Sequence, residues 1–481
     1  MKNPKWLSKT EIKEILDYTL SDEEIEEAKT HLLTPVFEQV FESSVGNGTP
    51  YFKVRGDDRE IMDCTSQAWV LALGHGAMDP IYAAFLQAQK VSHHQYGFLD
   101  ETRAKLASKI ASIAPGKLHS GKVAFNNMGG SAANEAAIRL AYVSQKRSQK
   151  QQIVVFSRGY HGSSLALTGA TQYIRIATRY RPFGLGRWER AFFPYCYRCS
   201  WNYKNGLLGK KDKDCKLECL DLFQKFVEET TNSDVAAVLL EPMQGAGGQI
   251  PAPVEWLQGL QEICNKNKIQ IIYDEFQTGF GRTGNMFATD YYNELGGIDV
   301  SPDMMTLAKA AGGGLPLGIL LASNEYKQFS EAEEHSTFSS TPVPMAACLI
   351  VLEIMEKYNI PGNARKMGEI ITKRLLELQT SHPVIGDVRG PGLFIGVEFV
   401  KDPKTREPFT ILAEEMKKEG WKQAIYFQGM MPIVKPSGDI VRNVLKIKPP
   451  LIITEEEATV ICDRFETCLK NCLNDLHWKI K

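Results

Sequence analysis

One stretch of the chain decides the fold, because it sets a lysine between strand-like runs and glycines: Ser301-Pro-Asp-Met-Met-Thr-Leu-Ala-Lys309-Ala-Ala-Gly-Gly-Gly314-Leu-Pro-Leu-Gly318. Upstream, an apolar run ends in an aspartate, Ile269-Gln-Ile-Ile-Tyr-Asp274. Either charged residue alone would be expected at the surface, where most charged side chains lie. The apolar and glycine-rich surroundings of both predict instead that they share a buried site.

The region around these two residues alternates short apolar runs with helical stretches, from about residue 75 to 340. The runs are residues 121–126, 152–157, 235–241, 269–274 and 316–323. Nearly continuous apolar strands that alternate with helices predict an α/β sheet covered on both faces. Such sheets bind ligands beyond the carboxyl ends of their strands. Glu241 and Asp274 both lie at such ends, so we expect them in one pocket.

The length of 481 residues predicts about two or three lobes rather than one core. We expect residues 75–344 to form a large domain, with an exposed lysine-rich insertion at about 195–220. Residues 1–74 and 345–481 are expected to form a smaller α+β domain. Within it, residues 387–400 read as a twisted hairpin, and residues 344–357 as a long helix.

Composition excludes several classes of function. A formal charge of −1 gives no field that attracts nucleic acid or an anionic membrane. No apolar run is long enough to span a bilayer, and the first residues do not read as a signal peptide. The ten cysteines are scattered, so free thiols in a reducing cytoplasm are expected. The sequence therefore predicts a soluble cytoplasmic protein.

Two further motifs follow predicted strands. Gly130 and Ser131, in Met128-Gly-Gly130-Ser131-Ala-Ala-Asn134, open a helix whose first amides can bind a phosphate. The motif Gly159-Tyr160-His161-Gly162 places a tyrosine where it can stack on a flat ring. A phosphate site, a flat ring, a buried lysine and a buried aspartate are the requirements of a pyridoxal phosphate enzyme. There the lysine forms a Schiff base and the aspartate keeps the pyridine nitrogen protonated.

Together these motifs resemble the class III aminotransferases (subgroup II) of the fold-type I pyridoxal phosphate enzymes. The resemblance runs from about Tyr51 to Thr467. It rests on Tyr160-His-Gly162, Glu241-Pro-Met-Gln-Gly245, Asp274-Glu-Phe-Gln277-Thr-Gly-Phe-Gly-Arg-Thr-Gly284 and Ala308-Lys309-Ala-Ala-Gly-Gly-Gly-Leu-Pro-Leu-Gly318. It implies a large domain with a mixed, mostly parallel sheet covered by helices, and a smaller α+β domain from the N- and C-terminal segments.

The resemblance also implies residue roles. Lys309 would bind pyridoxal phosphate covalently, and Asp274 would pair with its ring nitrogen. Gln277 would approach the ring hydroxyl, Tyr160 would stack on the ring with His161 beside it, and Gly130 and Ser131 would hold the phosphate. Glu241 would support the segment that carries Asp274. Thr337 matches a phosphate-binding threonine that the other subunit donates, which implies a homodimer or a dimer of dimers.

Three departures from the family bear on the substrate. Lys446 stands where ornithine- and 4-aminobutyrate-type members carry an arginine that clamps the substrate carboxylate, and lysine lacks its bidentate fork. Ala246 replaces the glutamate that neutralises this arginine, and Ala132 replaces a glutamate of the phosphate loop. The segment ending in Trp69 resembles one of ω-amine:pyruvate transaminases, where the tryptophan lines the substrate pocket; a core tryptophan at the domain seam is the alternative.

These features favour an aminotransferase that takes a terminal amine or ω-amino acid as donor and a 2-oxo acid, such as pyruvate or 2-oxoglutarate, as acceptor. An amino-acid racemase or epimerase, and a lyase acting on phosphorylated amines, remain alternatives with the same fold. The spacing of Cys196, Cys199, Cys215 and Cys219 is close to that of a structural zinc ribbon. Packing alone can also hold this loop, and no metal is expected in the catalytic site.

Overall fold

The computed structural model describes residues 7–34, 36–145, 150–173, 187–203, 209–330, 333–334 and 336–477. Residues 1–43 and 53–58 form one compact unit, and residues 44–52 and 59–481 form a second. The first unit contains α1 (Lys9–Asp17) and α2 (Asp22–Thr30). Ser21 caps α2, since its side chain accepts a hydrogen bond from the Glu24 amide. Strands β1 (Phe41–Ser44), β2 (Tyr51–Val54) and β3 (Asp57–Asp63) follow in sequence.

The second unit is built on a seven-stranded sheet with the order β4-β12-β11-β10-β7-β5-β6. Its strands are β4 (Lys122–Asn126), β5 (Gln152–Phe156), β6 (Arg187–Ala191), β7 (Val235–Leu240), β10 (Gln270–Asp274), β11 (Met304–Leu307) and β12 (Gly318–Ala322). Neighbouring strands from β11 to β6 are parallel, and β12 runs antiparallel to both of its neighbours. The mixed, mostly parallel sheet that the sequence predicts is therefore confirmed.

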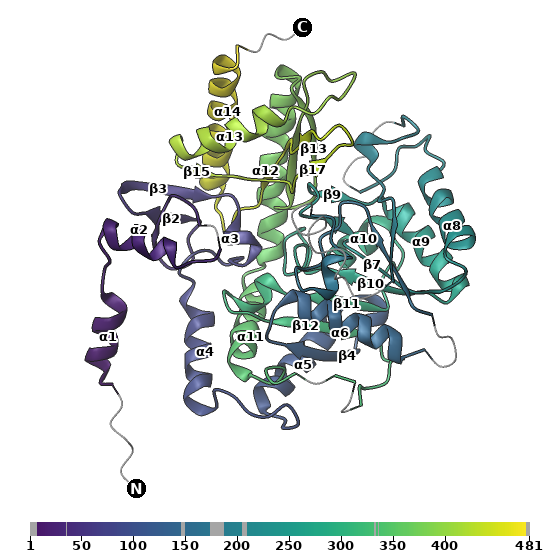
Figure 1. Ribbon diagram of the computed structural model, residues 1–481, viewed down its shortest axis with the longest axis horizontal. Coiled ribbons are helices and arrows are strands. Elements are labelled where there is room, and N and C mark those ends of the chain that lie inside the picture. The colour runs from purple at the N-terminus through teal and green to yellow at the C-terminus, as the bar shows by residue number, and fades with distance from the viewer. Residues whose placement is uncertain are drawn as a thin grey trace. The chain divides into compact units, whose positions relative to one another are not determined.

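Helices cover both faces of this sheet, because its central strands are apolar on both sides. Helices α8 (Glu218–Thr230) and α9 (Val254–Asn267) lie together on one side, where Phe156 and Tyr273 pack against Trp256 (Figure 1). Helix α6 (Gly130–Val143) covers the opposite face, where alternate strand residues pack against its alanines. Parallel strands buried on both faces carry the near-continuous apolar runs seen in the sequence.

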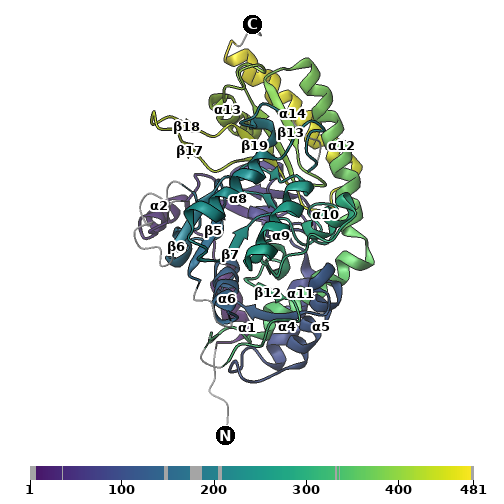
Figure 2. The same cartoon turned by 90° about the vertical axis from the view of Figure 1, so that its right-hand side faces the viewer.

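A second sheet has the order β13-β14-β19-β16 and is antiparallel throughout. It consists of β13 (Ile385–Arg389), β14 (Ile395–Phe399), β16 (Gln428–Gly429) and β19 (Val444–Ile447), so the predicted hairpin within residues 387–400 is confirmed. Helices α12 (Ile360–Ser381), α13 (Thr410–Lys422) and α14 (Glu455–Asp475) accompany it, and α12 and α14 lie side by side in Figure 2.

The remaining helices form a third group, in which α4 (Met78–Lys90) and α5 (Glu101–Ile113) pack against α11 (Pro342–Lys357). The shorter elements are α3 (Ser66–Trp69), α10 (Ala288–Gly296), η1 (Gly116–Leu118), η2 (Ala166–Thr168), η4 (Cys196–Arg198), η5 (Lys309–Gly312), β8 (Met243–Gln244), β9 (Ile250–Pro251), β15 (Ile425–Tyr426), β17 (Ile433–Val434) and β18 (Ile440–Val441). Within the described residues, no helix is long and apolar enough to cross a membrane. The division into residues 1–74, 75–344 and 345–481 stays a prediction.

Candidate active site

Lys309 lies just beyond the carboxyl end of β11 and begins the short helix η5. Its backbone has a φ of 51°, a left-handed conformation that turns the chain sharply after the strand. Its Nζ lies 5.4 Å from the centroid of the Phe276 ring and 5.9 Å from that of Trp69. Burial lowers the pKa of Lys309, while the carboxylates of Asp274 and Glu241 act in the opposite direction.

Asp274 ends β10 beside Thr306 of β11, which places it next to the Lys309 segment. The carboxylate is buried, and its Oδ2 lies 2.9 Å from both Asn134 Nδ2 and His161 Nδ1. Its Oδ1 accepts a hydrogen bond from the Phe276 amide at 3.2 Å. Asn134 was not predicted as a site residue. The feature that could have indicated it is a single amide side chain among the alanines of its helix, where it is buried. These contacts hold Asp274 in one orientation.

Glu241 follows β7, the parallel neighbour of β10, so it lies at the same edge of the sheet. Its two oxygens accept hydrogen bonds from the amides of Tyr160 at 3.0 Å and Gly245 at 2.8 Å. Burial raises the pKa of Glu241 to about 7, and the charge of Asp274 acts in the same direction. Glu241 thus joins the loop after β5 to the loop after β7, and the expected convergence of strand ends is present.

The residues present fit pyridoxal phosphate on three observations. His161 Nε2 and Gln277 Oε1 are buried and have no hydrogen-bond partner within the described residues. Gly129 has a φ of 88° and open space where a side chain would point, directly before the first amides of α6. A Cβ on Gly130 would lie 2.6 Å from the Phe276 ring, so only glycine fits there. Buried polar groups without a partner, together with an open helix start, suit a flat phosphorylated ring.

Trp69 and Lys446, the two predicted substrate residues, both lie near Lys309. The Lys446 Nζ is 4.7 Å from the centroid of the Trp69 ring. Sequence reasoning missed Lys448, whose Nζ lies 2.8 Å from the same centroid. Trp69 ends α3, in which all four residues have positive φ; the Asp63 carboxylate accepts hydrogen bonds from the amides of Thr65 and Gln67 and so fixes this turn.

Two other predicted site residues are Ser131 and Thr337. Ser131 Oγ accepts a hydrogen bond from the Ser163 amide at 3.3 Å at the start of α6, and its role in holding the phosphate stays a prediction. Thr337 is exposed in the turn before α11. Exposure suits a residue that serves another subunit, and this role stays a prediction.

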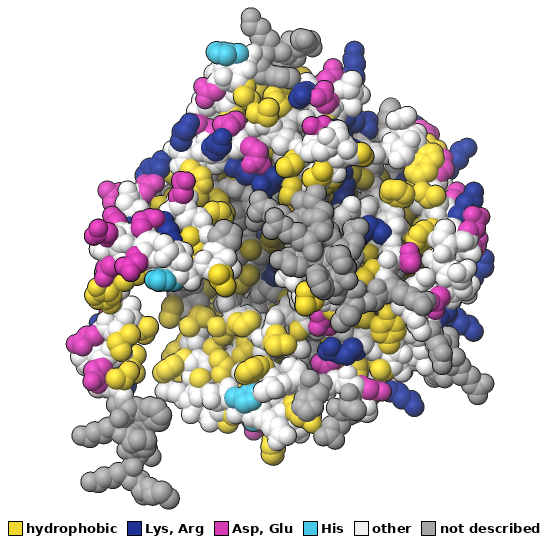
Figure 3. Space-filling view, viewed as in Figure 1, with side chains coloured by type: hydrophobic (Ala, Val, Ile, Leu, Met, Phe, Trp, Pro, Cys, Tyr) yellow, Lys and Arg dark blue, Asp and Glu magenta, His cyan; other side chains and the backbone are white. Residues whose placement is uncertain are grey.

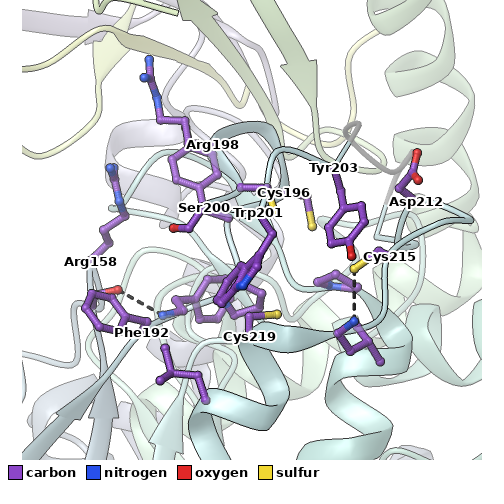
Figure 4. A pocket seen from close by; sticks show the side chains of 18 of the residues that line it. Arg158, Phe192, Cys196, Arg198, Ser200, Trp201, Tyr203, Asp212, Cys215 and Cys219 are labelled. Carbon is purple, nitrogen blue, oxygen red and sulfur yellow. Dashed lines mark hydrogen bonds between the residues drawn. The ribbon is translucent and has the colours of Figure 1, made fainter.

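The four cysteines of the predicted insertion line one cavity of about 550 Å³, together with aromatic residues such as Trp201 and Tyr203 (Figure 4). Burial raises the pKa of Cys196 to about 12, and the three other thiols act in the same direction. Among the described residues, no group of three or more His, Cys, Asp or Glu side chains is arranged to hold a metal ion. The zinc alternative therefore gains no support. Residues 204–208 of this insertion lie outside the described residues.

Comparisons with known proteins identify the family of this chain. The model of the family "Aminotransferase class-III" matches residues 44–469. The chain is 32% identical to the leucine/methionine racemase of Thermococcus litoralis over 86% of this chain and 87% of that one. It is 31% identical to the adenosylmethionine-8-amino-7-oxononanoate aminotransferase of Methanocaldococcus jannaschii, over 88% and 91%.

Among solved structures, the thermostable (S)-enantioselective omega-transaminase of Thermomicrobium roseum is similar, with a TM-score of 0.80 and 25% identity. The similarity covers 95% of this chain and all of that one. The fold-type I architecture expected from the sequence is confirmed. The family match over most of the length, with the Lys309–Asp274 geometry, shows that the chain belongs to the class III aminotransferases, which are pyridoxal-phosphate-dependent enzymes.

Proposed function

We propose that this aminotransferase takes its amino group from a terminal amine or ω-amino acid and gives it to a 2-oxo acid such as pyruvate or 2-oxoglutarate. The observation that carries the proposal is the half-buried Lys309 just beyond β11, next to the end of β10 where His161 holds the Asp274 carboxylate. The likeness to an omega-transaminase supports the donor class. So does Lys446 at the position where a carboxylate-clamping arginine was expected.

Pyridoxal phosphate, when bound, supplies an aldehyde that captures an amine and a ring that withdraws electrons from the adjacent carbon. Asp274 holds a proton at the ring nitrogen, and Asn134 and His161 keep its carboxylate aimed there. Lys309 Nζ takes the proton from the substrate carbon and returns it one position away, as general base and then general acid. Burial favours the neutral amine that the first step needs.

The remaining site residues bind and orient. The first amides of α6, with Gly130 and Ser131, hold the phosphate. Tyr160 would stack on the ring, and Gln277, whose Oε1 has no hydrogen-bond partner within the described residues, would approach the ring hydroxyl. A Cβ on Gly245 would lie 1.8 Å from Gln277 Oε1, so only glycine at position 245 leaves room for the Gln277 side chain.

A homodimer belongs to this proposal. Helix α4 buries Pro80 and Ala84 towards the core, yet it also exposes Met78, Ile81, Tyr82 and Phe85. These apolar side chains gather over α4 in Figure 3. A helix that is apolar on its outer face as well marks a surface for another chain. We place Thr337 of each subunit in the phosphate site of the other. All ten cysteines are free thiols, which supports a reducing, cytoplasmic location.

The similarity to a leucine/methionine racemase favours a second candidate, an amino-acid racemase that uses the same lysine. A transaminase depends on an acceptor and converts the bound cofactor to its amine form. A racemase needs no acceptor, and it exchanges the Cα hydrogen of an α-amino acid with solvent while it inverts the configuration.

The test is to incubate the purified, cofactor-loaded protein with single donors, without and then with pyruvate or 2-oxoglutarate. We expect terminal amines alone to bleach the visible cofactor absorption, and the acceptor to restore it. Lys309→Ala should retain the cofactor reversibly and lose this cycle, whereas Lys418→Ala, an exposed lysine of α13, should keep it. Deuterium exchange and inversion without bleaching would establish the racemase, and phosphate release from phosphoethanolamine would establish the lyase.

A further inference from the structure

The cavity of about 550 Å³ shown in Figure 4 is separate from the group of residues around Lys309, since neither Lys309 nor Asp274 lines it. Two aromatic side chains of its wall, Phe192 and Trp201, are 72% and 41% exposed. Ligand pockets are typically lined by aromatic side chains with a few polar groups among them. The exposed rings on this wall therefore indicate a surface that contacts a ligand.

Arg158, which follows β5, brings a positive charge to the same wall. Its guanidinium lies over the ring of Tyr195, with Cζ 4.8 Å from the ring centroid. The side chain is half-buried, and within the described residues its guanidinium has no hydrogen-bond or ion-pair partner. Arginine keeps its charge at ordinary pH values. A partly buried guanidinium without an acceptor is unfavourable, and an incoming anion would relieve that cost.

The carboxylates near Arg158 are already engaged by other arginines. Glu398 Oε2 accepts a hydrogen bond from Arg389 Nη1 at 2.7 Å, and Glu398 Oε1 accepts one from Arg198 Nε at 2.6 Å. Asp387 Oδ2 also accepts from Arg389 Nη1, at 2.8 Å. These pairs leave the charge of Arg158 without a matching carboxylate among the described residues.

The other charge on the cavity wall limits which anions fit. Among the described residues that line the cavity, the only carboxylate belongs to Asp212. Figure 4 shows Asp212 on the opposite side of the cavity from Arg158, with Trp201 between them. A second negative charge on a ligand would be repelled there, whereas an aromatic ring would meet other rings. The two oxygens of a carboxylate also match the planar fork of a guanidinium.

We propose that this cavity is a second ligand site, which binds an aromatic carboxylate with a single negative charge. The carboxylate pairs with Arg158, and the ring of the ligand packs against Trp201 and Phe192. The site lies outside the residues that hold the cofactor, so it is independent of the amine donor.

Calorimetry on the cofactor-loaded protein tests this site with two probes, 3-phenylpropanoate and its neutral analogue 3-phenylpropanamide. We expect wild type to bind the carboxylate about tenfold or more tightly than the amide, because only the carboxylate forms charge-assisted hydrogen bonds. Arg158→Met should bind the two probes equally, and this double comparison isolates the pairing of the two charges. Arg374→Met, at an exposed arginine of α12, is the control and should bind both probes as wild type does.

Two further variants locate the ring of the ligand. Trp201→Ala should weaken binding of both probes by a similar factor, and it should lose the change in tryptophan fluorescence that the carboxylate causes in wild type. Lys309→Ala should bind the carboxylate as tightly as wild type, since Lys309 does not line the cavity.

Three results would overturn the site: no binding of the carboxylate by wild type, carboxylate binding that Arg158→Met leaves unchanged, or carboxylate binding that is lost in Lys309→Ala. The third result would place the probe beside the cofactor instead. If Arg158→Met fails to fold, Arg158→Gln and Trp201→Ala decide the same question.

Discussion

Burial shifts the pKa values of single residues in this site away from their values in solution. Lys446 is the clearest case, because burial lowers its pKa to about 7 and the positive charge of Arg442 acts in the same direction. Lys309 and Lys417 also lower this pKa, whereas Glu241 raises it. Lys446 is therefore an ammonium ion below about pH 7 and a neutral amine above it. A buried group that titrates near neutrality gives the stability of the fold a pH dependence.

We expect the free energy of unfolding to rise as the pH increases above about 7, because the unfolded Lys446 side chain binds a proton in this range and the folded one does not. The rise can reach about 1.4 kcal/mol per pH unit, the limit for linkage to one proton. Urea denaturation at pH 7, 8 and 9 measures it. The slope should be smaller in Lys446→Met, and an equal slope in both proteins would contradict the lowered pKa of Lys446.

Asp274 closes an apolar run, so the sequence alone placed it at the end of a strand, which is β10. Lys309 was singled out by the glycine-rich segment around it, and the roles of both residues stay predictions. Asn134 and Lys448 were not predicted, because their contacts join segments that are distant in the sequence. Asn134 meets Asp274 across a helix and a strand, and Lys448 meets Trp69 from near the other end of the chain. No local sequence pattern predicts a contact between such distant residues.

Among the elements, α12 depends on close approach to the turn between β13 and β14. A Cβ on Gly368 would lie 2.1 Å from the Gly392 carbonyl oxygen, and Gly392 itself has a φ of 56°. Glycine inside a helix is normally unfavourable by about 1 kcal/mol relative to alanine. Here glycine at position 368 allows α12 to contact the backbone of the turn, and this packing outweighs the low helix propensity of glycine.

We expect Gly368→Ala to lower the free energy of unfolding by about 1–3 kcal/mol, because the added methyl group overpacks a backbone contact. Urea denaturation followed by circular dichroism measures this change. Lys373→Ala is the matched control, since that side chain is exposed on the same helix. An alanine variant as stable as the wild type would contradict this prediction, because it would show that the turn can move to accommodate the methyl group with no loss of stability.

The elements that the sequence predicted correctly were those with long apolar runs. Strands β4, β5, β7, β10 and β12 were all located, because each lies in a short, mostly apolar run. Strand β6 was missed because its sequence, Arg-Trp-Glu-Arg-Ala, carries the charges of an edge strand. Strand β11 was missed because four residues within Met304–Leu307 give too short a signal beside the glycine-rich segment.

At the scale of the whole molecule, the outer face of α4 predicts assembly. Tyr82→Glu places a charge among exposed apolar side chains, so we expect it to shift the protein from dimer to monomer in analytical ultracentrifugation. Cofactor affinity should fall by about tenfold, through loss of the contact from Thr337 of the partner subunit. Lys90→Glu, on the same helix, is the control.

A monomeric Tyr82→Glu protein that binds the cofactor as tightly as wild type would remove Thr337 from the phosphate site. A dimeric variant with unchanged affinity would show that the apolar face of α4 is not the contact between subunits.

The contact between Trp69 and Lys448 also has a consequence for the order of events during synthesis. The turn that carries Trp69 is made before the seven-stranded sheet, whereas Lys448, whose segment holds that turn through Cys64 and Ser66, is made after it. A nascent chain therefore contains every strand of the large sheet before the residues that hold the Trp69 turn are made.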